Sequence, residues 1–186
     1  WPDVAALAGE ITRHVQGFHT AELIRDGFEV VILGAPNAGK SSLFNALARR
    51  EAAIVSDEPG TTRDLLEIML DLDGALVRVT DTAGLRAEAG KVEAIGIRRA
   101  REKAHGADLV LALEDMTAQR AVDLAGIETP LLRVGSKADL RPAHGAAGDR
   151  YDFRISVVTG EGVGGLIAGI GRRASRAAGR GGGVFP

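Results

Sequence analysis

The sequence contains no cysteine among its 186 residues. This absence excludes disulfides, thiolate zinc sites, iron–sulfur clusters and cysteine nucleophiles. Long apolar runs are missing too, because none approaches the roughly 18 residues of a membrane-spanning helix. The N-terminal region also lacks the pattern of a signal peptide. We therefore expect a cytoplasmic protein with no membrane partner.

A large excess of charge of either sign is also lacking. The chain has 23 Lys and Arg against 25 Asp and Glu, which gives a net charge of −2. No overall basic field is available for nucleic acid, so any polyanion must be bound locally. Lysine itself is scarce, which makes the position of each one informative. The four lysines are Lys40, Lys91, Lys103 and Lys137.

The chain divides into three regions. Because it begins at Trp1 rather than Met, we expect a segment of a longer protein. Apolar residues at helical spacing over 3–25 predict a helix. This helix, in the region 1–27, either packs on the following domain or leads in from a neighbouring helical domain. Residues 28–176 form the main domain, and residues 177–186 form a Gly-rich tail, either a flexible linker or, alternatively, an RNA contact.

Buried strands alternate with helices in the main domain. Apolar runs without alternation predict strands covered on both faces at Phe28–Leu33, Asp108–Leu113 and Pro130–Val134. Asp73-Gly74 predicts a hairpin turn between two further strands. The remaining predicted strands are Leu65–Leu72, Ala75–Thr80 and Phe153–Val157, and the predicted helices are Ser41–Arg49, Val92–Lys103, 117–125 and Val163–Arg176. This order predicts an α/β fold with a mainly parallel sheet, one antiparallel edge hairpin and helices on both faces.

The segment Gly34–Ser41 matches the phosphate-binding pattern G-x-x-x-x-G-K-[ST], between a predicted strand and a predicted helix. Backbone N–H groups of such a loop point at phosphate oxygens, and the helix N-terminus adds partial positive charge. Lys40 can reach the β- and γ-phosphates, and the Ser41 hydroxyl can bind Mg²⁺. The alternative is a simple glycine-rich turn. The context favours a P-loop NTPase.

Two further segments complete the phosphate side. In Asp81-Thr82-Ala83-Gly84, the Asp81 carboxylate can hold Mg²⁺ through a water, and the Gly84 N–H can meet the γ-phosphate. In the loop Gly60-Thr61-Thr62-Arg63-Asp64, a threonine can complete the Mg²⁺ shell only when the γ-phosphate is present. That arrangement predicts a switch, although two adjacent threonines could instead cap a turn.

The segment Ser136-Lys137-Ala138-Asp139 indicates which base is bound. The Asp139 carboxylate can accept the N1–H and the exocyclic amine of guanine, and adenine offers no such pair of donors. The Lys137 stem can lie across the ring. Backbone N–H groups of Ser156-Val157-Val158 can meet the guanine O6. The sequence predicts GTP as substrate and GDP as product.

These motifs, in this order, resemble the translation-factor-related GTPases. More narrowly, PNAGKSSLFNAL, SDEPGTTRDLLE, DTAGLR and VEAIGIRRA resemble the G domain of the MnmE (TrmE) tRNA-modification GTPases, from Glu22 to Leu166. The resemblance implies a Ras-like G domain that is inserted in a helical domain. This G domain would hydrolyse GTP to drive a bacterial enzyme that modifies wobble uridine (U34). It also implies transient G-domain dimers, and tRNA and the flavoprotein MnmG (GidA) as partners of the full-length protein. The family's folate-binding domain and Cys motif are absent from this chain.

The same resemblance implies residue roles. Leu85 stands where many small GTPases have glutamine. The resemblance therefore implies that Glu93 is the catalytic acid; the alternative is an ordinary helix glutamate. Lys40 and Thr62 are implied to act with Glu93. K⁺ is held by Asn37, the backbone carbonyls of Ser56 and Glu58, and Thr61, while Mg²⁺ is held by Ser41, Thr62 and Asp81. The implied nucleotide and cofactor contacts are Asn37, Ala38, Gly39, Lys40, Ser41, Ser42, Ser56, Asp57, Glu58, Pro59, Gly60, Thr61, Thr62, Asp81, Thr82, Ala83, Gly84, Ser136, Lys137, Ala138, Asp139, Ser156, Val157 and Val158.

Some residues depart from the family pattern. Ser136 replaces the usual asparagine and shortens the side chain that contacts guanine N7 and ties this loop to the P-loop. Val157 and Val158 replace an alanine and a polar residue. We therefore expect guanine specificity through Asp139 with weaker affinity. Two alternatives stay open: a ribosome-assembly GTPase of the Era or Der type, and a nucleotide-binding interaction module that hydrolyses slowly.

Overall fold

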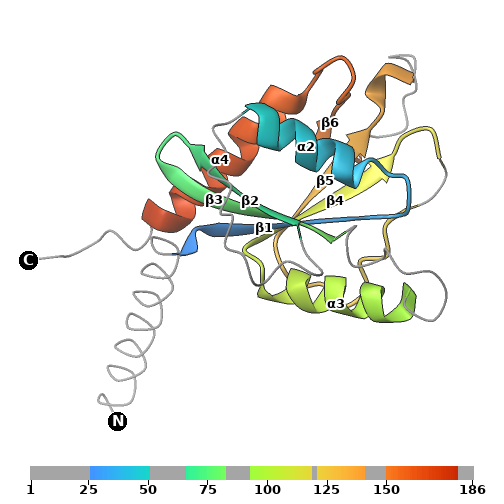
Figure 1. Ribbon diagram of the computed structural model, residues 1–186, viewed down its shortest axis with the longest axis horizontal. Helices are drawn as coiled ribbons and strands as arrows, with labels where there is room; N and C mark the ends of the chain where they lie inside the picture. Colours follow the sequence, from blue (N-terminus) through green and yellow to red (C-terminus); the bar gives the residue numbers. More distant parts are fainter. Residues whose placement is uncertain (1–25, 51–65, 83–92, 119–120, 141–149, 180–186) are drawn as a thin grey trace, which may run out of the picture.

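The computed structural model describes residues 26–50, 66–82, 93–118, 121–140 and 150–179. Their strands form one six-stranded sheet in the order β2-β3-β1-β4-β5-β6 (Figure 1). All neighbouring strands are parallel except the hairpin β2–β3. The elements are β1 (Phe28–Gly34), α2 (Lys40–Arg50), β2 (Leu66–Leu72), β3 (Ala75–Asp81), α3 (Glu93–Gly106), β4 (Leu109–Asp115), β5 (Leu131–Ser136), a 3-10 helix (Ala138–Leu140), β6 (Phe153–Arg154) and α4 (Val163–Gly179). The predicted fold class is confirmed.

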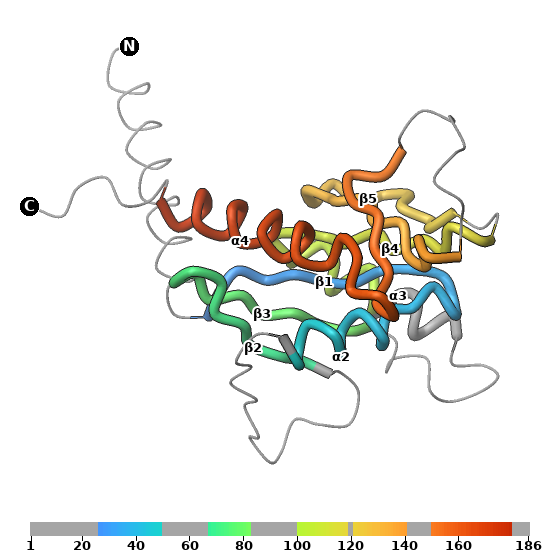
Figure 2. Tube along the Cα trace, turned by 90° about the horizontal axis from the view of Figure 1, so that it is seen from above, coloured from blue at the N-terminus to red at the C-terminus, as the bar shows by residue number. Residues whose placement is uncertain are grey.

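Helices cover both faces of the sheet. Figures 1 and 2 show α2 and α4 side by side on one face and α3 on the other. The central position of β1 in the sheet explains why its sequence is apolar except at Glu29. Val30 and Ile32 face α2 and α4, whereas Val31 and Leu33 face α3, and all four are buried. No helix among the described residues is long and apolar enough to cross a membrane.

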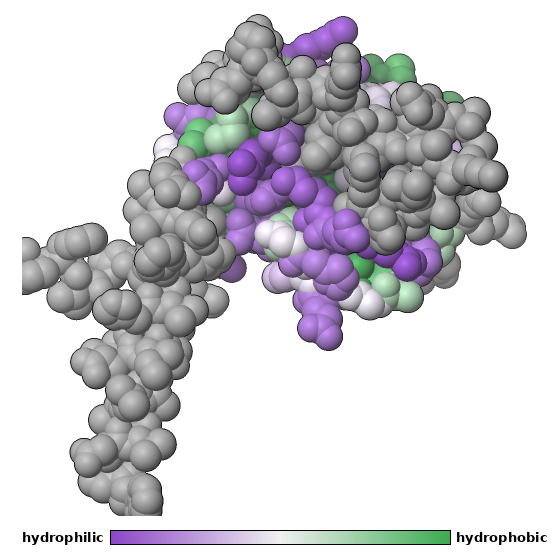
Figure 3. Space-filling view, turned by 60° about the horizontal axis from the view of Figure 1, so that its bottom comes forward, coloured by the Kyte–Doolittle hydropathy of each residue, from purple (hydrophilic) through white to green (hydrophobic). Residues whose placement is uncertain are grey.

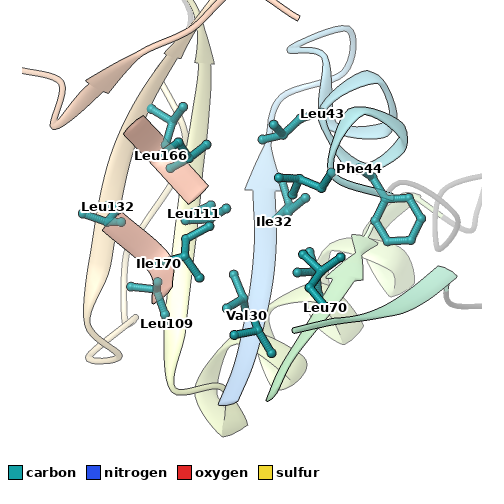
Figure 4. Close-up of a cluster of buried hydrophobic side chains, with 14 of the residues drawn as sticks. Val30, Ile32, Leu43, Phe44, Leu70, Leu109, Leu111, Leu132, Leu166 and Ile170 are labelled. Atoms are coloured by element: carbon teal, nitrogen blue, oxygen red, sulfur yellow. The ribbon is translucent and has the colours of Figure 1, made fainter. Parts of the chain in front are cut away.

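Large aliphatic side chains fill the layer between the sheet and α2 and α4. Figure 4 shows Leu43 and Phe44 of α2 and Leu166 and Ile170 of α4 gathered over the strands, and Leu43, Leu166 and Ile170 are fully buried. Figure 3 shows the opposite, α3 side of the molecule, where hydrophilic residues dominate the coloured surface. Among the described residues, the larger cluster of buried side chains therefore lies on the side of α2 and α4 and supports the helix that follows the P-loop.

The predicted hairpin turn is confirmed at Asp73-Gly74. Both residues have positive φ, 55° and 84°, as a two-residue type I′ turn requires. The Gly74 N–H also donates to Asp71 Oδ1 at 2.7 Å. This local geometry sets the antiparallel register of β2 and β3, from Leu66 opposite Asp81 to Leu72 opposite Ala75.

The predicted helix over 117–125 is wrong, because none of its described residues (117–118 and 121–125) is helical. Carboxylate side chains accept backbone N–H groups there instead. Asp115 Oδ1 accepts the Thr117 N–H at 2.8 Å, and Glu114 Oε1 accepts the Val122 N–H at 3.3 Å. Short acidic side chains compete in this way with helical hydrogen bonding.

Several predicted boundaries also move. The strand predicted over Phe153–Val157 ends at Arg154, because the Ser156 N–H donates to Glu161 O, at 2.9 Å, within a turn. Helix α4 continues to Gly179, so residues 177–179 of the predicted tail are helical. The predicted helix over 3–25, the loop over 51–63 and the rest of the tail lie outside the described residues.

Candidate functional site

The P-loop leaves the carboxyl end of β1 and enters α2. At Gly34 a side chain is excluded, since a Cβ there would lie 2.6 Å from Leu113 O on β4. Asn37 and Gly39 adopt left-handed backbone conformations with φ of 63° and 94°. The Leu43 N–H donates to Gly39 O at 2.8 Å, in the first turn of α2. The loop therefore curls around the N-terminus of a helix, where partial positive charge favours an anion.

Lys40 is the first residue of α2 and is only 5% exposed. Its ammonium donates to Gly34 O at 3.1 Å and to Ala35 O at 2.9 Å. The head group consequently lies within the curve of the loop. A buried cation at a helix N-terminus is the arrangement that receives phosphate oxygens.

Ser41 and Asp81 come together at the ends of α2 and β3. The Ser41 hydroxyl donates to Asp81 Oδ2 at 2.9 Å, and Asp81 is fully buried. The next residue, Thr82, donates its hydroxyl to Ile32 O at 2.8 Å and so fixes the chain to β1. A hydroxyl and a carboxylate are hard oxygen donors suited to Mg²⁺. The two predicted Mg²⁺ residues that the structure describes thus fit this ion.

The base-recognition segment Ser136–Asp139 follows β5 next to the P-loop. The Ser136 side chain is buried, and its oxygen lies 2.7 Å from Ala38 O and 3.1 Å from Glu114 O. The shorter side chain therefore still ties this segment to the P-loop. Asp139 lies in the 3-10 helix with its side chain exposed, free to face a ligand.

Lys137 has a left-handed backbone with φ of 59°, and its ammonium lies 2.6 Å from Asp115 Oδ2 at the end of β4. Burial raises the pKa of Asp115, but hydrogen bonds from Lys137 and Thr117 outweigh it and lower that pKa to about 2. Asp115 is therefore ionised at neutral pH and pairs with the lysine head group.

The segment after β6 lies beside the 3-10 helix, since the Ala138 N–H donates to Ile155 O at 3.0 Å. Of the three backbone donors predicted for the guanine O6, the Ser156 N–H already donates to Glu161 O. Val157 is partly buried and Val158 is 88% exposed. The turn that holds Ser156 therefore leaves Val157 and Val158 as the candidates for that contact.

The structure brings together the P-loop, Asp81 and the base-recognition segment at one end of the sheet. Ser42 is an exposed residue of α2 beside them. Glu93 begins α3, but its side chain lies outside the described residues. The other predicted site residues outside the described ranges are Ser56, Asp57, Glu58, Pro59, Gly60, Thr61, Thr62, Ala83 and Gly84.

Sequence reasoning missed two acidic residues, Glu114 and Asp115. Both end β4 and contact the base-recognition segment, Glu114 through its carbonyl oxygen and Asp115 through its carboxylate. An acidic pair at the carboxyl end of an otherwise apolar strand was the available signal, because ligand sites in parallel sheets lie at that end.

Comparison with known proteins identifies the relatives of this chain. A family model described as "50S ribosome-binding GTPase" matches residues 29–144. The tRNA modification GTPase MnmE of Mesorhizobium japonicum is 65% identical over 188 aligned positions, which cover the whole of this chain and 42% of that protein. The protein of the same name from Chelativorans sp. is 53% identical over 163 positions, with coverage of 88% and 36%. This chain thus spans about two fifths of these relatives.

Solved structures show the same fold. The Era protein of Aquifex aeolicus bound to GDP·AlF4⁻ has a TM-score of 0.55 and 24% identity, covering 78% of this chain and 56% of that one. The cytosolic domain of the T. maritima FeoB iron transporter has a TM-score of 0.56 and 26% identity, covering 79% and 64%.

Proposed function

Since the chain belongs to the 50S ribosome-binding GTPase family, we propose that it is the GTP-hydrolysing domain of an enzyme that modifies wobble uridine (U34) in tRNA. The observation that carries the proposal is the meeting of three segments at one end of the sheet: Lys40 in the P-loop, Asp81 beside Ser41, and Asp139 in the base-recognition segment. Similarity to MnmE proteins along the whole chain supports the link to tRNA modification.

Each described residue has a task in this proposal. The Lys40 ammonium exchanges its two carbonyl partners for oxygens of the β- and γ-phosphates. Ser41 and Asp81 hold Mg²⁺, which neutralises charge on the same phosphates when it is bound. The Asp139 carboxylate accepts the guanine N1–H and exocyclic amine. Together these contacts orient GTP along the carboxyl edge of the sheet.

The attacking water needs a further group, because Leu85 has no polar atom. We assign that task to Glu93, where α3 begins. K⁺, when bound, would supply positive charge to the phosphates in place of an arginine finger, and Asn37, Thr61 and the backbone carbonyls of Ser56 and Glu58 would hold it. Asn37 is the exposed member of the P-loop with a left-handed backbone, which lets its side chain project beside the phosphates.

In the full-length protein, this domain would work in the cytoplasm. Pairing of two G domains around GTP and K⁺ would couple hydrolysis to opening and closing of the enzyme, and tRNA and the flavoprotein MnmG would bind elsewhere on it. The similarity to MnmE proteins is the support for these partners.

Steady-state GTP turnover in KCl and in NaCl tests the proposal, with and without Glu93→Ala. We expect faster turnover in KCl, and a loss of at least about 100-fold in Glu93→Ala, as for a general acid or base. The matched control is Glu128→Ala, an exposed glutamate before β5, which should change nothing. Equal rates in both salts and unchanged turnover in Glu93→Ala would contradict the mechanism.

Ribosome binding is the second candidate, since the description of the matching family names it. Co-sedimentation with purified 50S subunits, compared between GTP and GDP, distinguishes the two. GTP-dependent sedimentation would favour ribosome assembly. Absence of co-sedimentation with either nucleotide, together with K⁺-stimulated turnover, would favour the tRNA-modification assignment.

A further inference from the structure

We propose that Asp115 is a positioning residue for guanine-nucleotide binding, and that it acts by anchoring the Lys137 side chain across the base site. The inference rests on the proposed function, because it assumes that Ser136–Asp139 binds the base. It assigns a role to a residue outside all the nucleotide-binding motifs.

The first observation is the backbone of Lys137. Its φ of 59° lies in the left-handed region, which residues with a side chain occupy only when their surroundings hold them there. The neighbouring peptides are fixed, since the Leu140 N–H donates to Lys137 O at 3.1 Å and the Ala138 N–H to Ile155 O at 3.0 Å. The Lys137 side chain has one described anchor, the Asp115 carboxylate at 2.6 Å.

The second observation is that Asp115 is itself fixed. It stands opposite Ser136 in the parallel register of β4 and β5. Thr117 donates its N–H and its hydroxyl to Asp115 Oδ1, at 2.8 and 2.6 Å. Oδ2 is therefore left to face Lys137. The side chain of Asp115 is 15% exposed against 37% for Lys137, so the buried partner holds the more exposed one.

The third observation concerns Glu114, the preceding residue of β4. Its carbonyl oxygen lies 3.1 Å from the Ser136 hydroxyl. Its carboxylate is buried, accepts the Val122 N–H and lies 2.8 Å from an Arg150 guanidinium nitrogen. These contacts of Glu114 fix the end of β4 next to Asp115. Asp115 thus projects from a rigid strand end, as preorganisation of a binding site requires.

A consequence for binding follows. With its ammonium held at Asp115, the Lys137 stem is already extended before a base arrives. Without the anchor, nucleotide binding must order this rotamer-rich side chain. Ordering one such side chain corresponds to a loss of about three- to tenfold in affinity. The chemical step is at the phosphates, so its rate should stay the same.

The test compares Asp115→Asn with the unchanged domain in binding of a fluorescent GDP analogue and in GTP turnover. We expect Kd for GDP and KM for GTP to rise together by about three- to tenfold, with kcat within about twofold. Asp123→Asn is the control. Asp123 is an exposed aspartate on the loop between β4 and β5, and it pairs with Arg101 of α3. It should leave Kd, KM and kcat unchanged.

A double-mutant cycle with Lys137→Met assigns the effect to the pair. In the Lys137→Met background, Asp115→Asn should cause no further loss. A full further loss, or a Kd that is unchanged in Asp115→Asn itself, would overturn the inference. If Asp115→Asn fails to fold, Thr117→Val replaces it. Loss of one of the two hydrogen bonds to Oδ1 should then raise Kd by a smaller factor, and an unchanged Kd would overturn the inference.

Failure of the proposed function would look different. If the unchanged domain and all its variants bound ATP as well as GTP, or bound neither, the premise that Ser136–Asp139 recognises guanine would be wrong. Unchanged GDP affinity in Asp115→Asn, in a domain that selects GTP, would contradict only the role of Asp115.

Discussion

The two faces of the sheet are packed in different ways. On the face under α2 and α4, the buried side chains are large, with Leu43 and Leu47 from α2 and Leu166 and Ile170 from α4. On the face under α3, the side chains that the structure describes in this region are small, with Ala100 and Ala104 on α3 and Ala107 just after it. Small side chains bring α3 close to the strands but bury little apolar area. The described side chains of the leucine-rich face, under α2 and α4, therefore bury more apolar area than these alanines.

Charged groups also lie on the α3 face of the sheet. We call the residues Glu29, Glu67, Arg78 and Lys103 the α3 charge cluster. Lys103 of α3 lies 2.7 Å from Glu29 Oε1 on β1 and 3.5 Å from Glu67 Oε1 on β2, and Arg78 on β3 lies 3.5 Å from Glu29 Oε2. Ion pairs at this degree of exposure contribute little stability but fix orientation. Lys103 thus adds direction-dependent contacts between α3 and the sheet to the packing of Ala100 and Ala104.

The largest expected effect comes from the leucine-rich face. Leu111→Ala on β4 should lower the free energy of unfolding by about 2–5 kcal/mol, because the side chain is fully buried and leaves a cavity. Denaturant unfolding measures it. Val158→Ala is the control, since Val158 is 88% exposed, and should change little. A loss below about 1 kcal/mol in Leu111→Ala would contradict the cavity argument.

A smaller effect is expected from enlarging a residue on the α3 face. Ala104 is fully buried against β1 and β4. Ala104→Leu should destabilise by about 1–3 kcal/mol, since the added atoms force α3 away from the sheet. Denaturant unfolding measures this cost against Ala168→Leu, at an exposed position of α4. Equal stability in the two variants would show that the α3 face has room, contrary to the close packing inferred for it.

The smallest effect should come from the α3 charge cluster. Lys103→Met removes the cation that lies between Glu29 and Glu67. We expect a loss of about 1 kcal/mol, because Glu29 is mostly buried and loses a partner. Arg101→Met on the same helix is the control, since its partner Asp123 is largely exposed. Thermal unfolding of both variants checks the order, and an equal loss in both would contradict a special role for Lys103.

Features set by neighbouring residues could be predicted from the sequence, whereas contacts between residues far apart in the chain could not. The P-loop and the Asp73-Gly74 turn are set by adjacent residues, through backbone conformations that few residue types adopt. The pairing of Asp115 with Lys137 joins residues 22 positions apart, and nothing local marks it. The predicted helix over 117–125 failed for the same reason, since Glu114 accepts a backbone N–H eight residues away.

Residue type alone was also a poor guide at Ser136. Ser136 was expected only to shorten the side chain that ties the base segment to the P-loop. The close approach of β4, β5 and the P-loop places the hydroxyl within 3.1 Å of two carbonyl oxygens. Whether a side chain reaches its partner depends on the distance between the two backbones, and that distance is set by the packing of the strands in the folded sheet.

The two edges of the sheet have a consequence for behaviour in concentrated solution. β6 has two residues, too few to template a strand from another molecule. At the other edge, β2 pairs only with β3 among the described strands, and it carries exposed Glu67 and Asp71. Repeated negative charge along an edge strand disfavours pairing with a second copy of itself. We therefore expect this sheet to resist extension into aggregates at both edges.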